Sequence, residues 1–427
     1  MSTLKAVRGT RDLLPPETAL WNHVESTARA VFTRYHFGEI RTPVFEDTQL
    51  FARGVGEETD IVSKEMYTWE DRARAQSEKA QSLTLRPENT AGVVRAYIEH
   101  QMDKTGHLQK LYYIGPQFRR ERPQKGRYRQ FFQIGAEVIG PPSSGSESPL
   151  RDAEVLEMLA TFLDELGITG WQLTLNSVGS SQDRPRYIAA LRAALEPVKG
   201  RMCVDCQRRA DTNPLRVLDC KVPEDQPIIE TLPRIADFLD DSSKAHFAAV
   251  LAGLDASGVK YTINPRLVRG LDYYTRTTFE FTVETGLGTQ NALLGGGRYD
   301  GLSEMLGGPK APGIGFAIGE DRLILILQAQ QSDQNAAKID AYIAPLGEAQ
   351  NAAALALARE LRRAGLKVEV GDGSFRLKKS FEAADRVARK VVLLGEDEVQ
   401  SGILTVKDFS NGEQTKISRE EFIRLMQ

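Results

Sequence analysis

A basic segment between two apolar, strand-like stretches carries residue types that could bind an anion. From Arg119 to Gln130 it holds six basic residues and one acid. Arginine offers a planar fork of donors that suits phosphate oxygens, and the Pro-Gln-Lys-Gly sequence before Arg127 predicts a turn. A hairpin would place Arg119 beside Phe131. A phosphate-binding arginine and an aromatic ring would then face the same nucleotide. A solvated basic loop with a buried Phe131 explains the same charge pattern equally well.

A second segment that could take part in chemistry is glycine-rich. It reads GIGFAIGEDRLILIL, from Gly313 to Leu327. Its glycines allow a neighbouring backbone to pass close. A helix is predicted to begin near Gly319, with Arg322 in its first turn. The spacing G-x-G-x-x-x-G is not the dinucleotide-binding fingerprint, and no βαβ pattern surrounds it. Taken alone, the segment is better explained by tight packing, with Arg322 in a surface ion pair.

The elements that must position these residues form a mixed helix and strand pattern. An amphipathic helix is predicted near Thr18–Tyr35, and the stretch EIRTPVFE after it is extended, with Pro43 favouring an edge or an interface. Strands are predicted at Lys110–Gly115, Phe131–Ile139, Gln172–Ser177 and Thr277–Glu284. Because turns rather than helices join several of them, an antiparallel sheet is favoured.

Three further regions complete the expected organisation. Residues 180–258 are alanine-rich and helical in pattern, which predicts a helical domain inserted into a main domain of residues 1–327. Residues 328–337 are polar and predict a linker. Residues 338–427 alternate strands and helices, including a helix over FEAADRVARK, and predict a small α/β domain with a mostly parallel sheet. The fold class is therefore expected to be α+β.

The composition limits the kinds of function that the chain can have. The net charge is −3 over 427 residues, so the molecule is not a basic nucleic-acid coat, and anions must be held by local clusters. No apolar run reaches about 18 residues, which argues against a membrane span. The start of the chain, MSTLKAVRGTRDLLPP, lacks an apolar signal core. A cytoplasmic location is therefore expected.

The cysteines form half of a zinc pattern. Cys203-x-x-Cys206 is followed by Cys220, and these are the chain's 3 cysteines. A fourth ligand is not apparent, because His246 lies outside the usual ligand spacings. Buried or surface thiols, and no metal site, are therefore expected.

Two motifs and their surroundings resemble a known enzyme class. Arg-x-Glu at 119–121 with Arg-x-x-x-Phe at 127–131 resembles motif 2 of the class II aminoacyl-tRNA synthetases, and Gly-x-Gly-Phe at 313–316 with Glu-Asp-Arg at 320–322 resembles motif 3. The region of Pro43 resembles motif 1, which builds the dimer interface in that class. LVRGLDYYTRTTFEF at 267–281 and GGGRYDGL at 295–302 resemble the histidyl-tRNA synthetase family in particular. VRGTRDLLP and TLRPENTAGVVRAYIEH fit it too, so the resemblance covers essentially the whole chain.

The resemblance implies an architecture and a reaction. The architecture is a homodimer with a class II antiparallel sheet flanked by helices, an inserted helical domain and a C-terminal anticodon-binding domain. The reaction joins L-histidine to ATP, giving histidyl-adenylate and pyrophosphate, and then transfers histidine to the 3′ end of tRNA(His). Two anions must approach each other in the first step, so positive charge and positioning should dominate catalysis. Mg²⁺ is implied by the triphosphate, held mostly by phosphate oxygens and water.

The same resemblance implies roles for individual residues. Arg269 and Arg119 are the implied catalytic residues. The implied ATP-binding residues are Arg119, Glu121, Arg127, Phe131 and Arg322. The implied histidine-binding residues are Glu88, Thr90, Gln133, Glu137, Arg269, Tyr273 and Tyr274. The implied tRNA-binding residues are Arg122, Lys125 and Arg129. Without the family, Glu88 is explained as an acid at a helix N-terminus, and Arg269 as an ion-pair partner of Asp272.

Three other functions remain open at this stage. A synthetase-like regulatory subunit of ATP phosphoribosyltransferase binds histidine without charging tRNA and typically lacks the C-terminal domain. A class II synthetase for another amino acid is disfavoured by RGLDYY at 269–274. An RNA-binding scaffold would not need Arg119, Arg269 and Arg322 together. The C-terminal domain and these arginines favour the enzyme.

Overall fold

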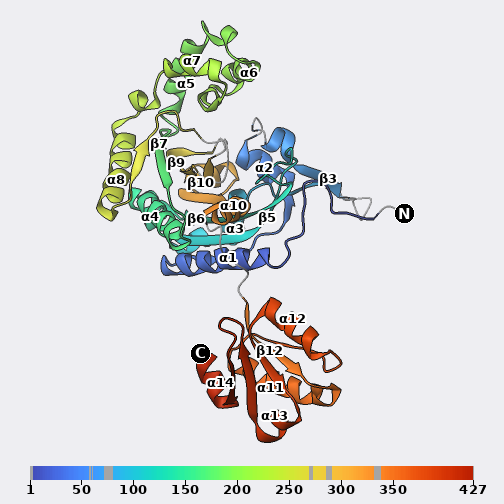
Figure 1. Ribbon diagram of the computed structural model, residues 1–427. Helices are drawn as coiled ribbons and strands as arrows, with labels where there is room; N and C mark the ends of the chain where they lie inside the picture. The colour runs from blue at the N-terminus through green and yellow to red at the C-terminus, as the bar shows by residue number, and fades with distance from the viewer. Residues whose placement is uncertain are drawn as a thin grey trace. The chain divides into compact units, whose positions relative to one another are not determined.

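The computed structural model describes residues 3–56, 59, 61–71, 80–268, 273–284, 291–330 and 338–426 (Figure 1). The chain divides into two compact units, Met1–Ser332 and Asp333–Gln427. Within the described ranges, no helix is long and apolar enough to cross a membrane.

The first unit is built on a sheet of strand order β1-β5-β6-β11-β10-β9-β7-β8. These strands are β1 (Gly38–Glu39), β5 (Gln109–Phe118), β6 (Gln130–Ile139), β7 (Trp171–Ser177), β8 (Tyr261–Ile263), β9 (Thr275–Val283), β10 (Ala292–Arg298) and β11 (Gly313–Gly319). The inner strands from β5 to β7 pair antiparallel, and the edge strands β1 and β8 pair in parallel. The predicted antiparallel sheet is confirmed, and each of the four predicted strands falls on an observed one.

Helices and a second small sheet surround this large sheet. The helices of the main body are α1 (Glu17–Arg34), α2 (Thr48–Val55), α3 (Thr90–Glu99), α4 (Pro149–Glu165), α8 (Asp241–Ser257), α9 (Leu302–Met305) and α10 (Glu320–Gln330). The small sheet has the order β2-β4-β3, with strands β2 (Phe45–Asp47), β3 (Tyr67–Asp71) and β4 (Gln81–Leu85). The predicted helix near Thr18–Tyr35 is confirmed as α1.

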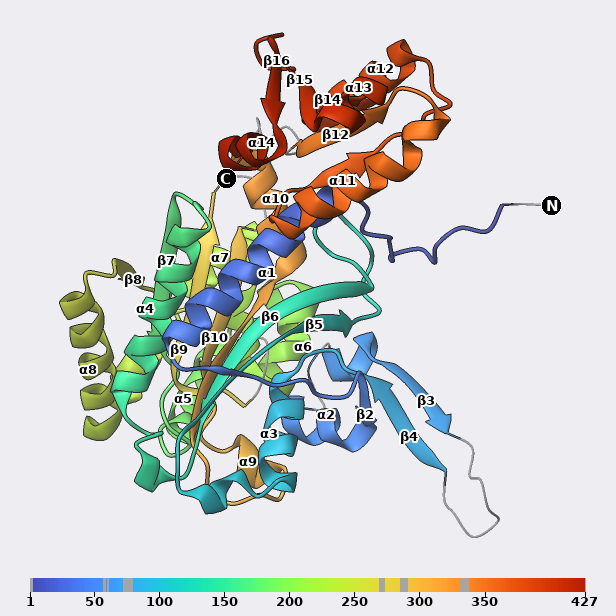
Figure 2. The same ribbon diagram turned by 90° about the horizontal axis from the view of Figure 1, so that it is seen from below.

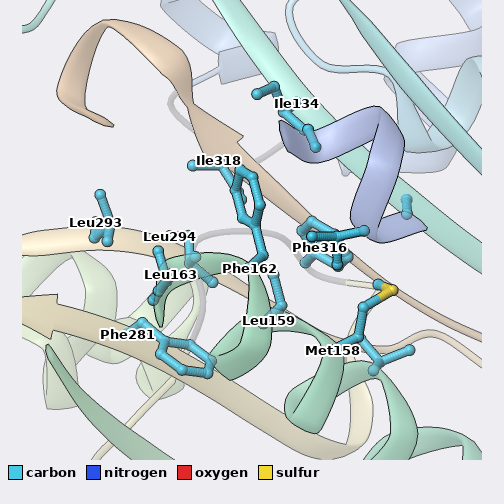
Figure 3. Packing of buried hydrophobic residues seen from close by; sticks show 14 of the residues in the cluster. Ile134, Met158, Leu159, Phe162, Leu163, Phe281, Leu293, Leu294, Phe316 and Ile318 are labelled. Atoms are coloured by element: carbon cyan, nitrogen blue, oxygen red, sulfur yellow. The ribbon is translucent and has the colours of Figure 1, made fainter. Parts of the chain in front are cut away.

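Strand alternation divides the large sheet into a core face and an open face. On β6, Ile134, Ala136 and Val138 join the main hydrophobic core, whereas Gln133 and Glu137 point the other way. Helices α1 and α4 lie on the core side of the sheet (Figure 2). Figure 3 shows side chains of α4, among them Phe162, facing Phe316 and Ile318 of β11. The polar positions are therefore left for the opposite face.

A group of short helices within the predicted insertion has a core of its own. Its elements are α5 (Arg184–Leu195), η4 (Lys199–Arg201), α6 (Val204–Thr212), η5 (Pro214–Asp219), η6 (Pro223–Asp225), α7 (Gln226–Glu230) and η7 (Ile235–Phe238), where η marks 3-10 helices. Their buried residues cluster between Tyr187 and Leu239. Helix α8 packs instead on α4, and its Val250 and Leu254 belong to the main core. The boundaries 180–258 stay a prediction.

The cysteines of this helical group have an acidic neighbour that the sequence interpretation did not consider. Asp225 lies with Cys203, Cys206 and Cys220, and the ligand atoms of all four lie within 4.8 Å of one another. His246 is elsewhere: its Nε2 lies 2.9 Å from a carboxylate oxygen of Asp152. A candidate fourth ligand that the sequence did not indicate therefore lies beside the cysteines, and the expectation of no metal site stays a prediction.

The second unit holds a five-stranded sheet of order β13-β12-β14-β15-β16. Its elements are β12 (Ile339–Pro345), α11 (Asn351–Arg363), β13 (Val368–Val370), α12 (Leu377–Val387), β14 (Ala388–Leu394), α13 (Glu396–Ser401), β15 (Ile403–Asp408), β16 (Gln414–Ser418) and α14 (Arg419–Met426). Strand β12 pairs in parallel with β13 and β14, but β15 pairs antiparallel with β14 and β16. The prediction of a mostly parallel sheet is wrong, because the chain turns back twice after β14.

Two predicted boundaries also shift. The helix expected over FEAADRVARK ends at Val387, and Ala388 already pairs with Ile339 in the sheet. Ala388 is fully buried there, so packing overrides its helix propensity. Helix α10 continues to Gln330, three residues into the expected linker of 328–337. Residues 331–337 of that linker lie outside the described residues.

Candidate active site

A cavity of about 230 Å³ opens on the polar face of the large sheet. Strands β6, β10 and β11, the start of α3, the β5–β6 hairpin and the start of α10 contribute to its walls. The sequence-predicted residues that line it are Glu88, Thr90, Arg119, Glu121, Arg127, Phe131, Gln133, Tyr273, Tyr274 and Arg322. Residues that are far apart in the sequence, from Glu88 to Arg322, thus line one cavity.

The hairpin between β5 and β6 gives one end of the cavity its positive charge. Gln124 and Arg127 exchange backbone hydrogen bonds of 3.1 and 2.9 Å, and Gly126 adopts a φ of +74°. That left-handed conformation favours glycine, so the predicted turn is confirmed. The Arg119 N–H donates to the carbonyl of Arg129 at 3.0 Å, which continues the ladder beyond the strands.

Glu121 connects two of the arginines at this end. Its carboxylate accepts a hydrogen bond of 3.1 Å from Arg127, and it lies 3.8 Å from Arg119. The Arg119 guanidinium also lies 5.2 Å from the centre of the Phe131 ring, as the hairpin interpretation predicted. Arg119 and Phe131 therefore face one region of the cavity.

Arg322 completes the basic end from the first turn of α10. It donates to the carbonyl of Ala292 at 2.5 Å, which fixes its position against β10. Burial lowers the pKa of Arg322, and the positive charges of Arg127 and Arg119 lower it further, against the opposing effect of Glu121. Cations that destabilise one another in this way are suited to an anionic ligand that neutralises them.

The opposite chemistry surrounds Glu137 on β6. Thr90 donates to one of its carboxylate oxygens and Tyr299 to the other, each at 2.7 Å. Glu137 is fully buried, and burial raises its pKa to about 8 although both hydroxyls oppose the shift. Gly315 makes room for it, because a Cβ there would lie 1.7 Å from a Glu137 oxygen. Glu137 does not line the cavity itself, but it is hydrogen-bonded to Thr90 and Tyr299, which do.

The N-terminus of α3 adds a second buried acid to this end. The Glu88 carboxylate accepts from the backbone N–H groups of Thr90 and Ala91 at 2.8 and 3.0 Å. Glu88 thus occupies the helix-start position expected without the family, and it also lines the cavity. Burial raises its pKa against these peptide groups.

A buried amide and two tyrosines complete the wall. Gln133 is 8% exposed, and its Oε1 has no hydrogen-bond partner among the described residues. Tyr273 packs on Tyr274 with 4.8 Å between ring centres and meets the edge of Tyr299 at 5.9 Å. A buried acceptor without a partner is costly, so Gln133 is placed to receive a donor from a ligand.

Comparison with known proteins agrees with the motifs that build this cavity. Residues 9–323 match the protein family described as Histidyl-tRNA synthetase, and residues 340–427 match the Anticodon binding domain. The chain belongs to the histidyl-tRNA synthetase family. A Histidine--tRNA ligase of Koribacter versatilis is 73% identical over 98% of this chain and 95% of its own length. One of Solibacter usitatus is 56% identical over 98% and 97%.

A solved structure of a family member also has the same fold. The apo histidyl-tRNA synthetase of S. aureus is 38% identical, with a TM-score of 0.80, over 99% of this chain and 100% of that one. The α+β class II architecture expected from the sequence is therefore confirmed. The match extends through the C-terminal unit, which favours the catalytic family members over the regulatory alternative.

The residues with family-implied tRNA roles do not line the cavity. Arg122 and Lys125 are exposed on the hairpin loop. Arg129 is partly buried, since its backbone N–H donates to Gly9 at 2.7 Å and its side chain packs where a Gly9 Cβ would stand. Arg269 lies outside the described residues.

Sequence reasoning missed several residues of this family member's site. Tyr299 was quoted within GGGRYDGL without a role, yet it is a donor to Glu137. Asp321 accepts from the backbone N–H of Phe132 and from Arg11, each at 3.1 Å, which binds α10 to the hairpin strand and to the N-terminal segment. Continuing the alternation of sides one residue past β10 could have indicated Tyr299. No local pattern could have indicated Arg11, because its partner is in motif 3.

Proposed function

We propose that this chain is a histidine–tRNA ligase that activates L-histidine with ATP and transfers it to tRNA(His). One observation carries the proposal: a single cavity has a triple-arginine end and an end of buried acids and hydroxyls. The first suits a nucleotide, and the second suits an amino acid with hydrogen-bonding ring nitrogens. Full-length family membership supports the same reaction.

At the basic end, Arg119, Arg127 and Arg322 would bind the triphosphate, with Arg119 at the α-phosphate. Fixed cations there would stabilise the charge that develops when the histidine carboxylate attacks the α-phosphorus and pyrophosphate leaves. The Phe131 ring would stack on adenine. Glu121 keeps two of these arginines oriented before ATP arrives.

Magnesium fits the same end of the cavity. Glu121 offers carboxylate oxygens, the ligand type that Mg²⁺ prefers, next to the proposed phosphate site. Mg²⁺ bound there with the triphosphate would neutralise phosphate charge. The arginines would still position the α-phosphate for attack.

At the other end, the pattern of donors explains selection for an imidazole. The hydroxyl groups of Thr90 and Tyr299 each donate a hydrogen bond to Glu137. Their oxygens are then left as acceptors, as is Oε1 of Gln133. A histidine ring N–H and ammonium group would satisfy such acceptors, whereas an apolar side chain would leave them unpaired. Glu88, Tyr273 and Tyr274 would line the rest of this pocket, and Arg269 would reach the histidine carboxylate.

The decisive experiment is amino-acid-dependent exchange of pyrophosphate into ATP, screened over all twenty amino acids without tRNA. Exchange with histidine alone is the expected result. Exchange with a different amino acid would contradict the roles of Glu137 and Tyr274. Tight histidine binding without exchange would instead indicate a regulatory protein.

We also propose a homodimer formed through the motif 1 region. Val44 and Phe45 are 39% and 52% exposed beside Pro43, and Phe45 meets the edge of Trp69, itself 39% exposed, at 6.0 Å. An apolar patch of this kind is typical of an interaction surface. Analytical ultracentrifugation should show dimers, and a Phe45→Glu variant should shift them toward monomers. A wild-type monomer at micromolar concentration would contradict the proposal.

The tRNA would contact both units. Arg122 and Lys125 are exposed at the tip of the β5–β6 hairpin and would meet phosphates of the acceptor stem. Arg129 contributes less in this proposal, because the N-terminal segment covers it. The C-terminal unit would bind the anticodon, and a cytoplasmic location follows from tRNA as the acceptor. Arg122→Ala with Lys125→Ala should weaken charging but leave pyrophosphate exchange unchanged.

A further inference from the structure

Outside the active site, the four side chains Cys203, Cys206, Cys220 and Asp225 form a compact polar cluster. They come from the start of α6, the residue after η5, and the end of η6. Cys206, Cys220 and Asp225 are buried, and Cys203 is half-buried. The chain has 3 cysteines, and the fold places all of them in this cluster.

Two distances within the cluster are close to the edges of a small tetrahedron, and all four ligand atoms lie within 4.8 Å of one another. Sγ of Cys203 and Sγ of Cys220 lie 3.9 Å apart, and Sγ of Cys220 lies 3.2 Å from an oxygen of Asp225. Zinc bonds of about 2.3 Å to sulfur and about 2.0 Å to oxygen imply tetrahedral edges of about 3.8 and about 3.5 Å. The Cys203–Cys220 and Cys220–Asp225 separations are thus within about 0.3 Å of those that one shared cation requires.

Backbone N–H groups also surround the ligand atoms. The N–H of Cys206 donates to Sγ of Cys203, and that of Val222 donates to Sγ of Cys220, both at 3.4 Å. The N–H of Cys203 donates to Asp225 at 3.0 Å. Such bonds stabilise negative sulfur and oxygen and fix the direction of their lone pairs.

The burial of the Asp225 carboxylate beside three thiols is consistent with a bound cation. Asp225 is 1% exposed, and within the described ranges no Lys, Arg or His forms an ion pair with it. Three cysteines could pack as small apolar groups, but that explanation leaves a buried carboxylate beside them without a counterion.

We propose that Cys203, Cys206, Cys220 and Asp225 bind one Zn²⁺ ion as a structural site. Three thiols and one carboxylate supply the soft and hard donors that zinc accepts in tetrahedral geometry, and four protein ligands leave no position for a substrate. On binding, the three thiols release their protons to solvent and the carboxylate binds as its anion, with no redox step. The ion would join α6 to the loop before α7 and so hold the small helical core together.

The first test is metal analysis of the full-length, untagged chain purified without chelators from cells supplied with zinc. We expect about one zinc ion per chain, in line with the affinity of structural zinc sites. X-ray absorption should show three sulfur neighbours at about 2.3 Å and one oxygen at about 2.0 Å. Cobalt(II) in place of zinc should give the intense visible bands of a tetrahedral thiolate complex. A chain that takes up no zinc, or one with a disulfide between Cys203 and Cys220, would overturn the proposal.

Two matched variants test the unusual fourth ligand. Asp225→Asn should weaken zinc binding at least about tenfold, judged by competition with a chromophoric chelator. Asp219→Asn is the control, since Asp219 is exposed and pairs with Lys221 in the same segment. The control should bind zinc like the wild type. Unchanged affinity in Asp225→Asn would remove Asp225 from the site. Because the cluster lies outside the ATP and histidine cavity, loss of exchange activity alone would not bear on it.

Discussion

The last residue of β10 and the residue that follows it reach buried carboxyl groups on opposite faces of the large sheet. Arg298 extends to Asp152 of α4 on the core face, with both side chains fully buried. Tyr299 extends to Glu137 on the cavity face. Burial is complete at both sites, yet the two acids are held in opposite ways.

The difference comes from the charge of the partners. At Asp152 burial would raise the pKa, but Arg298 and the bond to His246 lower it to about 2. At Glu137 only hydroxyls donate, and burial raises the pKa to about 8. An ion pair makes Asp152 a fixed structural link. Hydrogen bonds to neutral groups leave Glu137 able to respond to a ligand.

The largest expected effect follows from breaking the core-face pair. Asp152→Asn leaves Arg298 buried without its main counter-charge, so the free energy of unfolding should fall by about 3–5 kcal/mol. Urea denaturation at neutral pH measures it. Asp300→Asn is the comparison, because Asp300 also pairs with Arg298, at 3.0 Å, but is partly exposed. Equal losses in both variants would contradict the special role of the buried pair.

On the cavity face, removal of a proposed phosphate contact should change rate and not stability. Arg119→Ala should lower histidine-dependent pyrophosphate exchange about 10²–10³-fold, the usual cost of losing one preorganised charge contact. Its melting temperature should stay near that of the wild type. Arg120→Ala is the control, since Arg120 is exposed and lies over Tyr67. Near-normal exchange in Arg119→Ala would exclude that residue from the mechanism.

A smaller effect is expected at Glu137, the carboxyl on the cavity face whose pKa is raised by burial. Glu137→Gln should lower kcat/KM for histidine about 10–100-fold, because a hydroxyl near the ring loses its acceptor. The folded pKa of Glu137 is raised, so its contribution to stability is present below about pH 4.5 and lost as pH rises through about 8. The variant should therefore lose part of the wild type's decline in melting temperature over that range. An unchanged pH profile would contradict the assignment.

The smallest effect concerns a buried acid with neither kind of partner. Both oxygens of Glu320 are buried without a hydrogen bond in the described structure. Burial raises its pKa to about 9, and the nearby charges of Glu25 and Asp321 add to the shift. Because the folded pKa exceeds the unfolded value, protonation of Glu320 favours the folded state at low pH. This contribution is lost as pH rises from about 4.5 through about 9.

Replacing this acid should therefore stabilise the protein. Glu320→Leu should raise the free energy of unfolding by about 1–2 kcal/mol near pH 9, and by less near pH 5. Thermal melting across that pH range is the measurement. A gain that is larger at low pH would show that Glu320 is not protonated in the folded chain.

Local patterns predicted the parts of the site that neighbouring residues build. The hairpin was predicted because its turn residues and flanking apolar stretches are adjacent in the chain, and α10 was predicted to begin near Gly319, at the end of the glycine-rich stretch. Strand direction in the C-terminal unit was not, since alternation is the same in parallel and antiparallel strands. The N-terminal cover over Arg129 and the approach of Asp225 to the cysteines depend on the packed fold, and an aspartate is too common to stand out as a ligand.

The specificity of the cavity depends indirectly on Gly315, because the absence of a side chain there leaves room for Glu137. It stands opposite Glu137 in the β6–β11 register, and the Glu137 carboxylate occupies the volume that any larger residue would need. A larger residue at position 315 thus requires a smaller one at position 137, and the two positions should covary among relatives that select other amino acids. Redesign of the substrate range would have to begin with both strands at once.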